Sequence, residues 1–288
     1  MIGWSFLRSR RWLGYFALTM AFAIACSLLG IWQLARRADA RMEIDRVETN
    51  YQRAAEPVSD VLSQLDSFDI SQKWTPVLLS GEYLRDQQLL VRNRPFGGNP
   101  GFEVLTPLLL KDGTVFVVDR GWLPIGNEQD YPDDVPDAPP GRVTVEVRLA
   151  AGEPTLGNRT APTGQIATIH LPDIAERVGL PTYTGAYGLL ATEDPTPATR
   201  PMAETKPLRD EGPHLSYALQ WFVFAILGFF GLGYLVRQEY RAVNADDPDE
   251  QARAELRLRK SAARKPSDSD IEDAAVDAAH SSSEATPN

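Results

Sequence analysis

Two uncharged apolar runs constrain the fold of this chain more than any other feature. The first covers residues 12–35 and the second covers residues 214–236. A helix needs roughly 20 predominantly apolar residues to cross the hydrocarbon core of a bilayer. We therefore expect two transmembrane helices, with residues 36–213 between them on one side of the membrane.

The first run follows Arg8, Arg10 and Arg11, and a basic start before an apolar stretch is also typical of a secretory signal peptide. However, the run is too long for the apolar region of a signal peptide and continues past Cys26, so an uncleaved span is predicted. Cys26 is the only cysteine. A disulfide framework is thereby excluded, and a packing role is expected for this buried thiol.

Arginines mark the ends of the spans. Arg8, Arg10 and Arg11 precede the first span, and Arg237 and Arg241 follow the second. By the positive-inside rule both termini are predicted to be cytoplasmic and the intervening segment to lie outside. Because the net charge is −10 and the bases cluster at span ends, nucleic acid is excluded as a partner class.

Between the spans, short segments have the composition of β-strands. Val143, Val145 and Val147 alternate with polar residues, which is typical of a half-buried strand. The segments predicted as strands are 76–84, 88–92, 102–106, 114–118, 142–149, 165–169 and 186–191. The fold class expected is membrane α+β, in which two transmembrane helices flank an extracytoplasmic, mostly antiparallel β domain, a small barrel or sandwich.

Breaks in composition divide the chain further. Helical segments are expected over 58–65 and 172–178, five prolines make 194–213 an extended linker, and the acidic, aromatic-poor end predicts disorder. The predicted parts are a cytoplasmic tail (1–11), a transmembrane helix (12–35), a helical extension and connector (36–70), the β-rich domain (71–193), the linker (194–213), a second transmembrane helix (214–236) and a largely disordered acidic cytoplasmic tail (237–288).

Familiar catalytic motifs are missing from the sequence. It has no phosphate loop, no Gly-x-Ser-x-Gly elbow and no His-Glu-x-x-His pair, and only three histidines. A copper carrier would need cysteines or several methionines and histidines. A cofactor would thus be held by few ligands in an apolar setting. Haem meets that limit, because one histidine can hold its iron and arginines can pair with its carboxylates.

His214 opens the second apolar run, and Tyr217 and Trp221 follow it by one and two helical turns. Two interpretations stay open on residue chemistry alone. One is a capping or interfacial histidine, which Pro213 at a helix start supports. The other is a ligand, because ionisable groups at a membrane edge are often functional. Trp32, Tyr217 and Trp221 equally suit the aromatic belt at a membrane surface.

Four motifs together resemble those of the Surfeit-locus (Surf-one) family of cytochrome c oxidase assembly factors, in the same order along the chain. They are Gly30-Ile-Trp-Gln-Leu-Ala-Arg36, Gly101-Phe-Glu-Val-Leu-Thr-Pro107, Val118-Asp-Arg-Gly-Trp-Leu-Pro124 and His214-Leu-Ser-Tyr-Ala-Leu-Gln-Trp221. The resemblance covers about residues 12–240. An Asn common shortly before the His is replaced here by Gly212-Pro213, and a Lys that often follows the Arg pair is absent.

The resemblance implies a non-catalytic role in building subunit I of haem-copper oxidase by binding or delivering haem a. It makes His214 the candidate axial ligand of the iron. The other candidate haem-binding residues are Trp221, Tyr217, Trp32, Gln33 and Arg36, and either Arg36 or Arg37 is expected to meet a haem propionate. Subunit I, haem a synthase and the bacterial plasma membrane are the implied partners. Arg120, Gly121 and Trp122 are interpreted as a turn joining two strands.

Two other classes of function remain open. The first is a membrane-anchored interaction protein that stabilises the nascent oxidase subunit without binding haem. The second is a membrane-anchored sensor whose output is the acidic tail, residues 244–288. Within that tail, a basic patch between Arg253 and Lys265 either is solvated or contacts anionic lipid.

Overall fold

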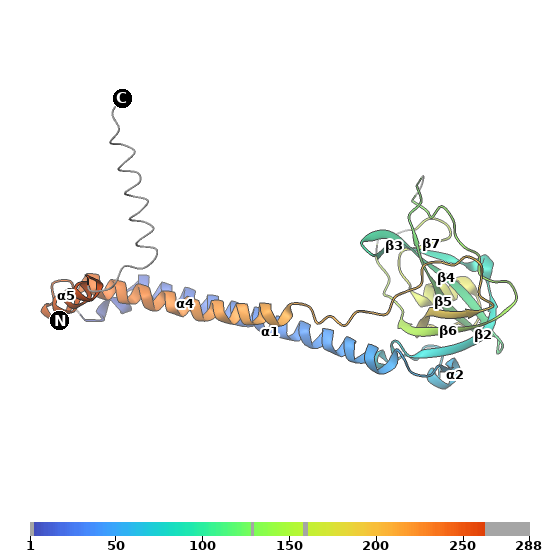
Figure 1. Cartoon of the computed structure of the whole chain (residues 1–288), viewed down its shortest axis with the longest axis horizontal. Helices are drawn as coiled ribbons and strands as arrows, with labels where there is room; N and C mark the ends of the chain where they lie inside the picture. Colours follow the sequence, from blue (N-terminus) through green and yellow to red (C-terminus); the bar gives the residue numbers. More distant parts are fainter. Residues whose placement is uncertain (1–2, 128–129, 158–160, 263–288) are drawn as a thin grey trace, which may run out of the picture. The chain divides into compact units, whose positions relative to one another are not determined.

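The computed structural model describes residues 3–127, 130–157 and 161–262, which form two compact units (Figure 1). One unit comprises the described residues of Met1–Leu34 and Leu215–Asn288, and the other is Ala35–His214. The boundary falls within two continuous helices, α1 (Arg10–Asn50) and α4 (His214–Val243). The predicted spans and the predicted β domain thus fall in different units.

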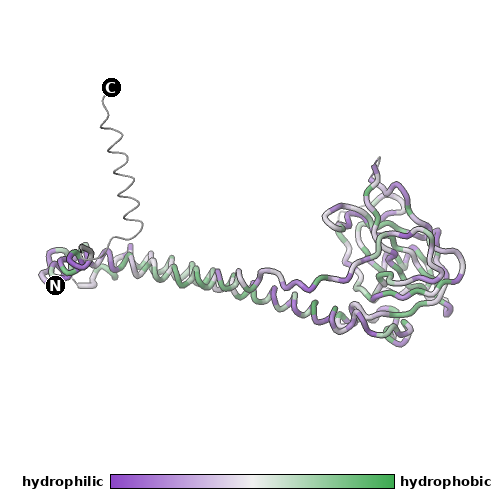
Figure 2. The backbone as a smooth tube through the Cα atoms, in the orientation of Figure 1, coloured by the Kyte–Doolittle hydropathy of each residue, from purple (hydrophilic) through white to green (hydrophobic). Residues whose placement is uncertain are grey.

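Both predicted spans are helical, and each is long and apolar enough to cross a membrane by length and composition. In Figure 2 the apolar colouring follows α4 and the first part of α1. Within their unit the two helices are antiparallel. Arg11 forms an ion pair with Glu239, and a Cβ on Gly30 would lie 2.8 Å from the ring of Phe222. Glycine at position 30 therefore allows the close approach that membrane helices use.

Small side chains fill the interface between these helices. Ala23, Cys26 and Ala225 form a buried cluster, and Trp221 packs against it. The prediction that Cys26 is a buried packing residue is confirmed.

The other unit is built around a closed five-stranded β-barrel. Its strands follow the order β2-β6-β8-β5-β4, and a second pairing of β2, with β4, closes the ring. The strands are β1 (Glu56–Pro57), β2 (Pro76–Tyr83), β3 (Leu89–Phe96), β4 (Asn99–Leu110), β5 (Val115–Pro124), β6 (Arg142–Ala151), β7 (Gln165–Ile166) and β8 (Ala186–Asp194). Only β1–β2, β3–β7 and β5–β8 are parallel among the named strand pairs of the described residues. The predicted mostly antiparallel domain is thus confirmed as a barrel.

Buried and exposed side chains alternate along β6, which explains why this strand lies in the wall of the barrel. Val143, Val145 and Val147 are buried, whereas Arg142 and Thr144 are exposed. Since successive side chains of a strand point to opposite faces, one face of β6 lines the apolar core and the other meets solvent. Leu79 and Phe116, from β2 and β5, belong to the same core.

The end of α1 is fastened to the barrel within the same unit. The carboxylate of Glu43 accepts hydrogen bonds from Lys73 Nζ at 2.6 Å and from Trp74 Nε1 at 2.9 Å. The buried side chain of Asn50 donates to the carbonyl oxygens of Ser71 and Lys73. The helical extension predicted after the first span therefore ends at Asn50 as part of the β unit.

The remaining short helices are close to prediction. α3 (Leu171–Val178) packs its apolar face on the sheet, and α2 (Val58–Val61) is shorter than the helix expected over 58–65. Single turns of 3-10 helix are η1 (Ser5–Arg8), η2 (Ile70–Gln72) and η3 (Arg85–Gln87).

The acidic tail was predicted to be disordered, but its residues Pro248–Ala262 form the helix α5. The N–H of Asp249 donates to Asp247 Oδ1 at 2.9 Å, and Glu250 forms ion pairs with Arg253 and Arg257. A capping aspartate and a proline at the first helical position start a helix, and ion pairs within it add support. Residues 263–288 of the predicted tail lie outside the described residues.

Candidate functional site

His214 is the first residue of α4 and is half-buried. The turn before it contains Gly212, whose φ of +67° is in the left-handed region that favours glycine. The N–H of Gly212 donates to Asp210 Oδ1 at 2.7 Å. A Cβ on Gly212 would lie 3.3 Å from the imidazole of His214, closer than most Cβ contacts. Gly212 thus lies close to the imidazole atoms Cδ2 and Nε2 of His214.

An ion-pair cluster joins this turn to α1 within the β unit. Arg37 Nε lies 2.9 Å from Glu211 Oε2, and Arg41 Nε lies 3.6 Å from the other carboxylate oxygen, Oε1. Arg36, the predicted candidate, lies instead 4.0 Å from Asp39 on the same helix. Arg37, Arg41 and Glu211 are therefore the residues that the structure brings together.

The aromatic candidates belong to the helical unit. Trp32 of α1 is 55% exposed and Tyr217 of α4 is 48% exposed. Trp221 is half-buried on the small-residue cluster, and its ring meets Phe224 edge to face at 5.8 Å. Gln33 is half-buried, one residue beyond Trp32. Trp32 and Tyr217 thus offer apolar surface to whatever surrounds the helices, whereas Trp221 helps hold the helices together.

The motif interpreted as a turn is part of β5. Arg120 is 2% exposed and donates to the carbonyl oxygens of Pro136 at 2.9 Å and Asp137 at 3.1 Å. Its Nε lies 3.8 Å from the buried carboxylate of Glu193. Its guanidinium also lies 5.7 Å from the ring of Tyr83. Burial, with Glu193 nearby, raises the pKa of the Tyr83 hydroxyl. The turn prediction is wrong, because Arg120 is a buried structural arginine within a strand.

Gly121 and Trp122 bind the segment that returns to the membrane. Trp122 and Met202 exchange two backbone hydrogen bonds, of 2.8 and 2.9 Å. Gly121 has a φ of +125°, and a Cβ there would lie 2.4 Å from the carbonyl oxygen of Met202. The Nε1 of Trp122 donates to the carbonyl oxygen of Arg94 at 2.7 Å. The predicted proline-rich linker is therefore partly attached to the barrel.

Carboxylates gather beside this attachment. Arg94 lies 3.0 Å from Glu103 and donates two hydrogen bonds, of 2.8 and 2.6 Å, to Glu153. Asp119 is buried and accepts from the N–H of Gly121 at 2.9 Å. Burial raises the pKa of Glu103 to about 7 and the pKa of Asp119 well above its ordinary value. Glu103 therefore keeps its proton at pH values where an exposed glutamate has already lost it.

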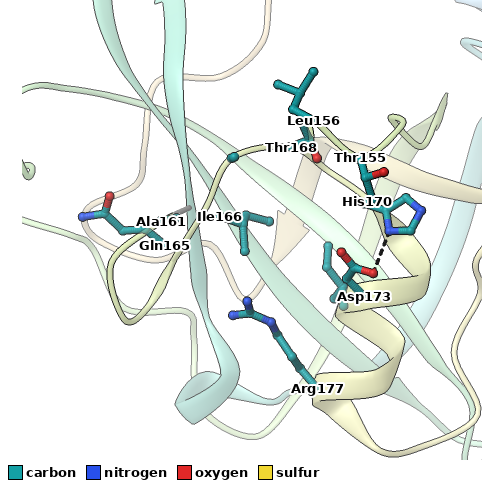
Figure 3. Close-up of a pocket in the computed structure, with 11 residues that line it drawn as sticks. Thr155, Leu156, Ala161, Gln165, Ile166, Thr168, His170, Asp173 and Arg177 are labelled. Atoms are coloured by element: carbon teal, nitrogen blue, oxygen red, sulfur yellow. Dashed lines mark ion pairs between the residues drawn. The ribbon is translucent and has the colours of Figure 1, made fainter. Parts of the chain in front are cut away.

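The β unit also contains a surface cavity of about 310 Å³, shown in Figure 3. It lies between α3 and the chain around β7. His170 Nδ1 lies 2.9 Å from Asp173 at one end, and the side chain of Arg177 extends along the cavity in Figure 3. None of the candidate residues predicted from the sequence lines this cavity.

The donor set limits which cofactors the site can hold. In the described part of the chain, no group of three or more His, Cys, Asp or Glu side chains is placed to bind a metal ion. One imidazole, together with arginines and aromatic rings among the candidate residues, is a set of groups that suits haem, whose porphyrin supplies four of the iron ligands. The residues present therefore fit a haem group in chemical type.

Comparisons with known proteins agree on one family. The model of the SURF1 family matches residues 20–226. SURF1-like proteins of Mycobacterium bovis and Mycobacterium tuberculosis, both described as uncharacterised, are each 30% identical over 264 residues, covering 88% of this chain and 96% of the relative. A SURF1-like protein of Dictyostelium discoideum is 29% identical over 116 residues, covering 37% of this chain and 42% of that protein.

Proposed function

Because this chain belongs to the SURF1 family, which serves generally in cytochrome oxidase assembly, we propose that it binds haem a and delivers it to subunit I of a haem-copper cytochrome c oxidase. The role is that of an assembly factor rather than an enzyme. His214 provides the axial ligand, and Trp32, Gln33, Tyr217 and Trp221 surround the ring.

The start of α4 carries this proposal. His214, Tyr217 and Trp221 are separated by three and four residues in one helix, so they share one helical face. Bound haem would supply an iron centre that exchanges axial ligands. A protein that must release its haem needs ligation weak enough to be replaced by the histidines of the oxidase, and a single imidazole at a helix end suits that need better than two.

The proposed topology supplies the setting. The two apolar helices associate the chain with a membrane. We place both termini in the cytoplasm of a bacterium and the β-barrel outside, because Arg8, Arg10 and Arg11 precede the first span. His214 then lies at the outer surface of the plasma membrane, where haem a synthase and subunit I would exchange haem with it.

The test is haem occupancy of the full chain purified in detergent from cells that make haem a. Visible absorption spectra of the wild type and of His214→Ala are compared, with His170→Ala as a matched control in the β unit. The proposal expects loss of the haem spectrum only in His214→Ala. Equal occupancy in all three proteins would remove His214 as the ligand.

A second function is favoured by an apolar groove of about 560 Å³ on the β unit. Phe96, Trp122, Ile125 and Met202 line it, and the rings of Phe96 and Trp122 stack at 5.3 Å. Such a surface suits contact with the nascent oxidase subunit without haem. Under this alternative, co-purification of subunit I persists in haem-free cells and survives His214→Ala.

A further inference from the structure

Arg37 and Arg41 both form ion pairs with the carboxylate of Glu211. Among the described ion pairs of the β unit, no other carboxylate is shared by two arginines one helical turn apart. Arg37 and Arg41 are four residues apart on α1, so their guanidinium groups leave the same face. Each reaches a different oxygen of Glu211, at 2.9 Å and 3.6 Å. Two arginines around one carboxylate form a binding site for a carboxylate group.

The position of this carboxylate in the chain connects it with His214. Glu211 precedes His214 by three residues, and the turn between them is fixed by Gly212 and Asp210. Whatever holds Glu211 on α1 therefore also fixes where α4 begins. Glu211 acts in this sense as a positioning residue for the histidine.

We propose that Arg37 and Arg41 form the binding site for a haem propionate, and that Glu211 occupies this site until haem arrives. The inference rests on the proposed haem-binding function and adds to it the residues that recognise the acidic side chains of the ligand. When a propionate enters, it takes over the hydrogen bond of Arg37 and the ion pair of Arg41, and Glu211 moves into solvent. No covalent bond changes, and charge is conserved at the site because one carboxylate replaces another.

The segment before Glu211 is suited to such a displacement. Leu208 is 89% exposed, and Lys206, Arg209 and Asp210 are also exposed. A cavity of about 210 Å³ separates part of this segment from α1. Segments with few buried contacts open at low cost, so the residues after Arg209, whose own ion pair with Glu48 is exposed, can shift without disturbing the barrel.

Competition between the two carboxylates has a consequence for transfer. The ion pair is partly exposed, because the side chains of Arg37 and Glu211 retain 29% and 40% of their accessible surface. Partly exposed pairs are weak, so Glu211 lowers propionate affinity by a modest factor rather than excluding the ligand. The chain then holds haem loosely and regains its own ion pair as haem leaves.

The experiment compares two probes on the full chain in detergent, namely iron protoporphyrin IX and its dimethyl ester, whose propionates carry no charge. Equilibrium titrations followed at the Soret band are made for the wild type, Glu211→Gln, His214→Ala and the double variant Arg37→Gln/Arg41→Gln. Glu48→Gln is the matched control, since Glu48 also pairs with an arginine of the return segment, Arg209, at 3.0 Å.

Glu211→Gln is expected to tighten binding of the diacid about 2- to 5-fold and to leave the ester unchanged, in line with the small worth of exposed ion pairs. The double arginine variant weakens the diacid selectively, and Glu48→Gln changes neither probe. An equal effect of Glu211→Gln on both probes, or weaker diacid binding, overturns the inference. If the diacid binds through His214 but the Glu211 and arginine variants bind it with the affinity of the wild type, only the propionate site fails. If His214→Ala binds both probes as the wild type does, the proposed function itself fails.

Discussion

Trp122 and Met202 are paired as in a two-stranded ladder, each donating its backbone N–H to the carbonyl oxygen of the other. This pairing attaches the segment that leads to α4 onto β5. It depends on Gly121, because any side chain at that position would meet the carbonyl oxygen of Met202. The motif in β5 therefore has a structural role that the strand alone does not require.

Replacing Gly121 by alanine is expected to detach the return segment. The substitution combines a backbone conformation that costs non-glycine residues about 1–3 kcal/mol with a collision against the backbone at Met202. Hydrogen exchange at the amide of Met202 should accelerate, while exchange in β6 changes little. Gly113→Ala is the control, because Gly113 has a φ of +83° with open space around it. Equal acceleration in both variants would contradict the assigned contact.

Stability of the β unit is expected to fall as pH rises from about 4.5 to about 7. Burial raises the pKa of Glu103 from 4.5 to about 7, so the folded state binds a proton that the unfolded state has lost in this range. A folded state that binds more protons loses stability as pH increases, here by something on the order of 2 kcal/mol.

The measurement for this prediction is the urea midpoint of the β unit within the full chain between pH 4.5 and 8. Glu103→Gln should flatten the dependence, and the exposed Glu82→Gln on β2 should leave it unchanged. A slope that persists in Glu103→Gln would assign the proton to another buried carboxyl, for which Asp119 is the neighbour to test.

Replacing Arg120 by methionine is expected to destabilise the barrel by about 3–5 kcal/mol, the usual cost of leaving one partner of a buried ion pair alone. The methionine fills much of the volume but leaves the carboxylate of Glu193 buried without a cation. The double variant Arg120→Met/Glu193→Gln should recover part of the loss. Thermal unfolding of the wild type, of Arg120→Met, of Glu193→Gln and of the double variant checks this, and an additive pair of losses would show that the two side chains are not coupled.

Replacing Gly30 by leucine is expected to separate α1 from α4 near Phe222. A Cβ at Gly30 already approaches the ring to 2.8 Å, and further carbons enlarge the overlap. Gly14→Leu is the matched control on the same helix, because nothing lies within 4 Å of its Cβ position. Thermal stability in detergent should fall for the first variant alone. A similar fall for both would show that helix propensity or lipid contact, and not packing, sets the result.

Patterns with a short period were sufficient to predict most elements. The valines of β6 and the uncharged runs of both spans determine local structure by themselves, since a strand repeats every two residues and a span needs only length and apolarity. Closure of the barrel through β2 and β4 was not predictable in the same way. Which strands pair depends on contacts between residues far apart in the chain.

Two local signals were present in the sequence and were missed. Asp247-Pro248-Asp249-Glu250 has the capping residue, proline and early acids of a helix start, and α5 begins there. Gly121 lies inside an otherwise strand-like motif, which often marks close approach of another backbone rather than a turn.

The candidate site shows where sequence reasoning ends. The spacing of His214, Tyr217 and Trp221 on one helical face follows from the helix itself. Glu211 could not be identified, because its partner Arg37 is 174 positions away and the ion pair depends on tertiary structure. A carboxylate in a proline-rich segment has no pattern that distinguishes it from the other acids there.

The attachments of the return segment set the reach of the chain between its fixed points. Met202 is bound to β5 and Arg209 pairs with Glu48 of α1, so residues 203–208 connect two anchored positions over about 25 Å at most for a fully stretched chain. Release of Glu211 lengthens the chain only beyond Arg209, over residues 210–213. The ion pair of Arg209 therefore shields the strand pairing at Trp122 from any pull that follows release of Glu211.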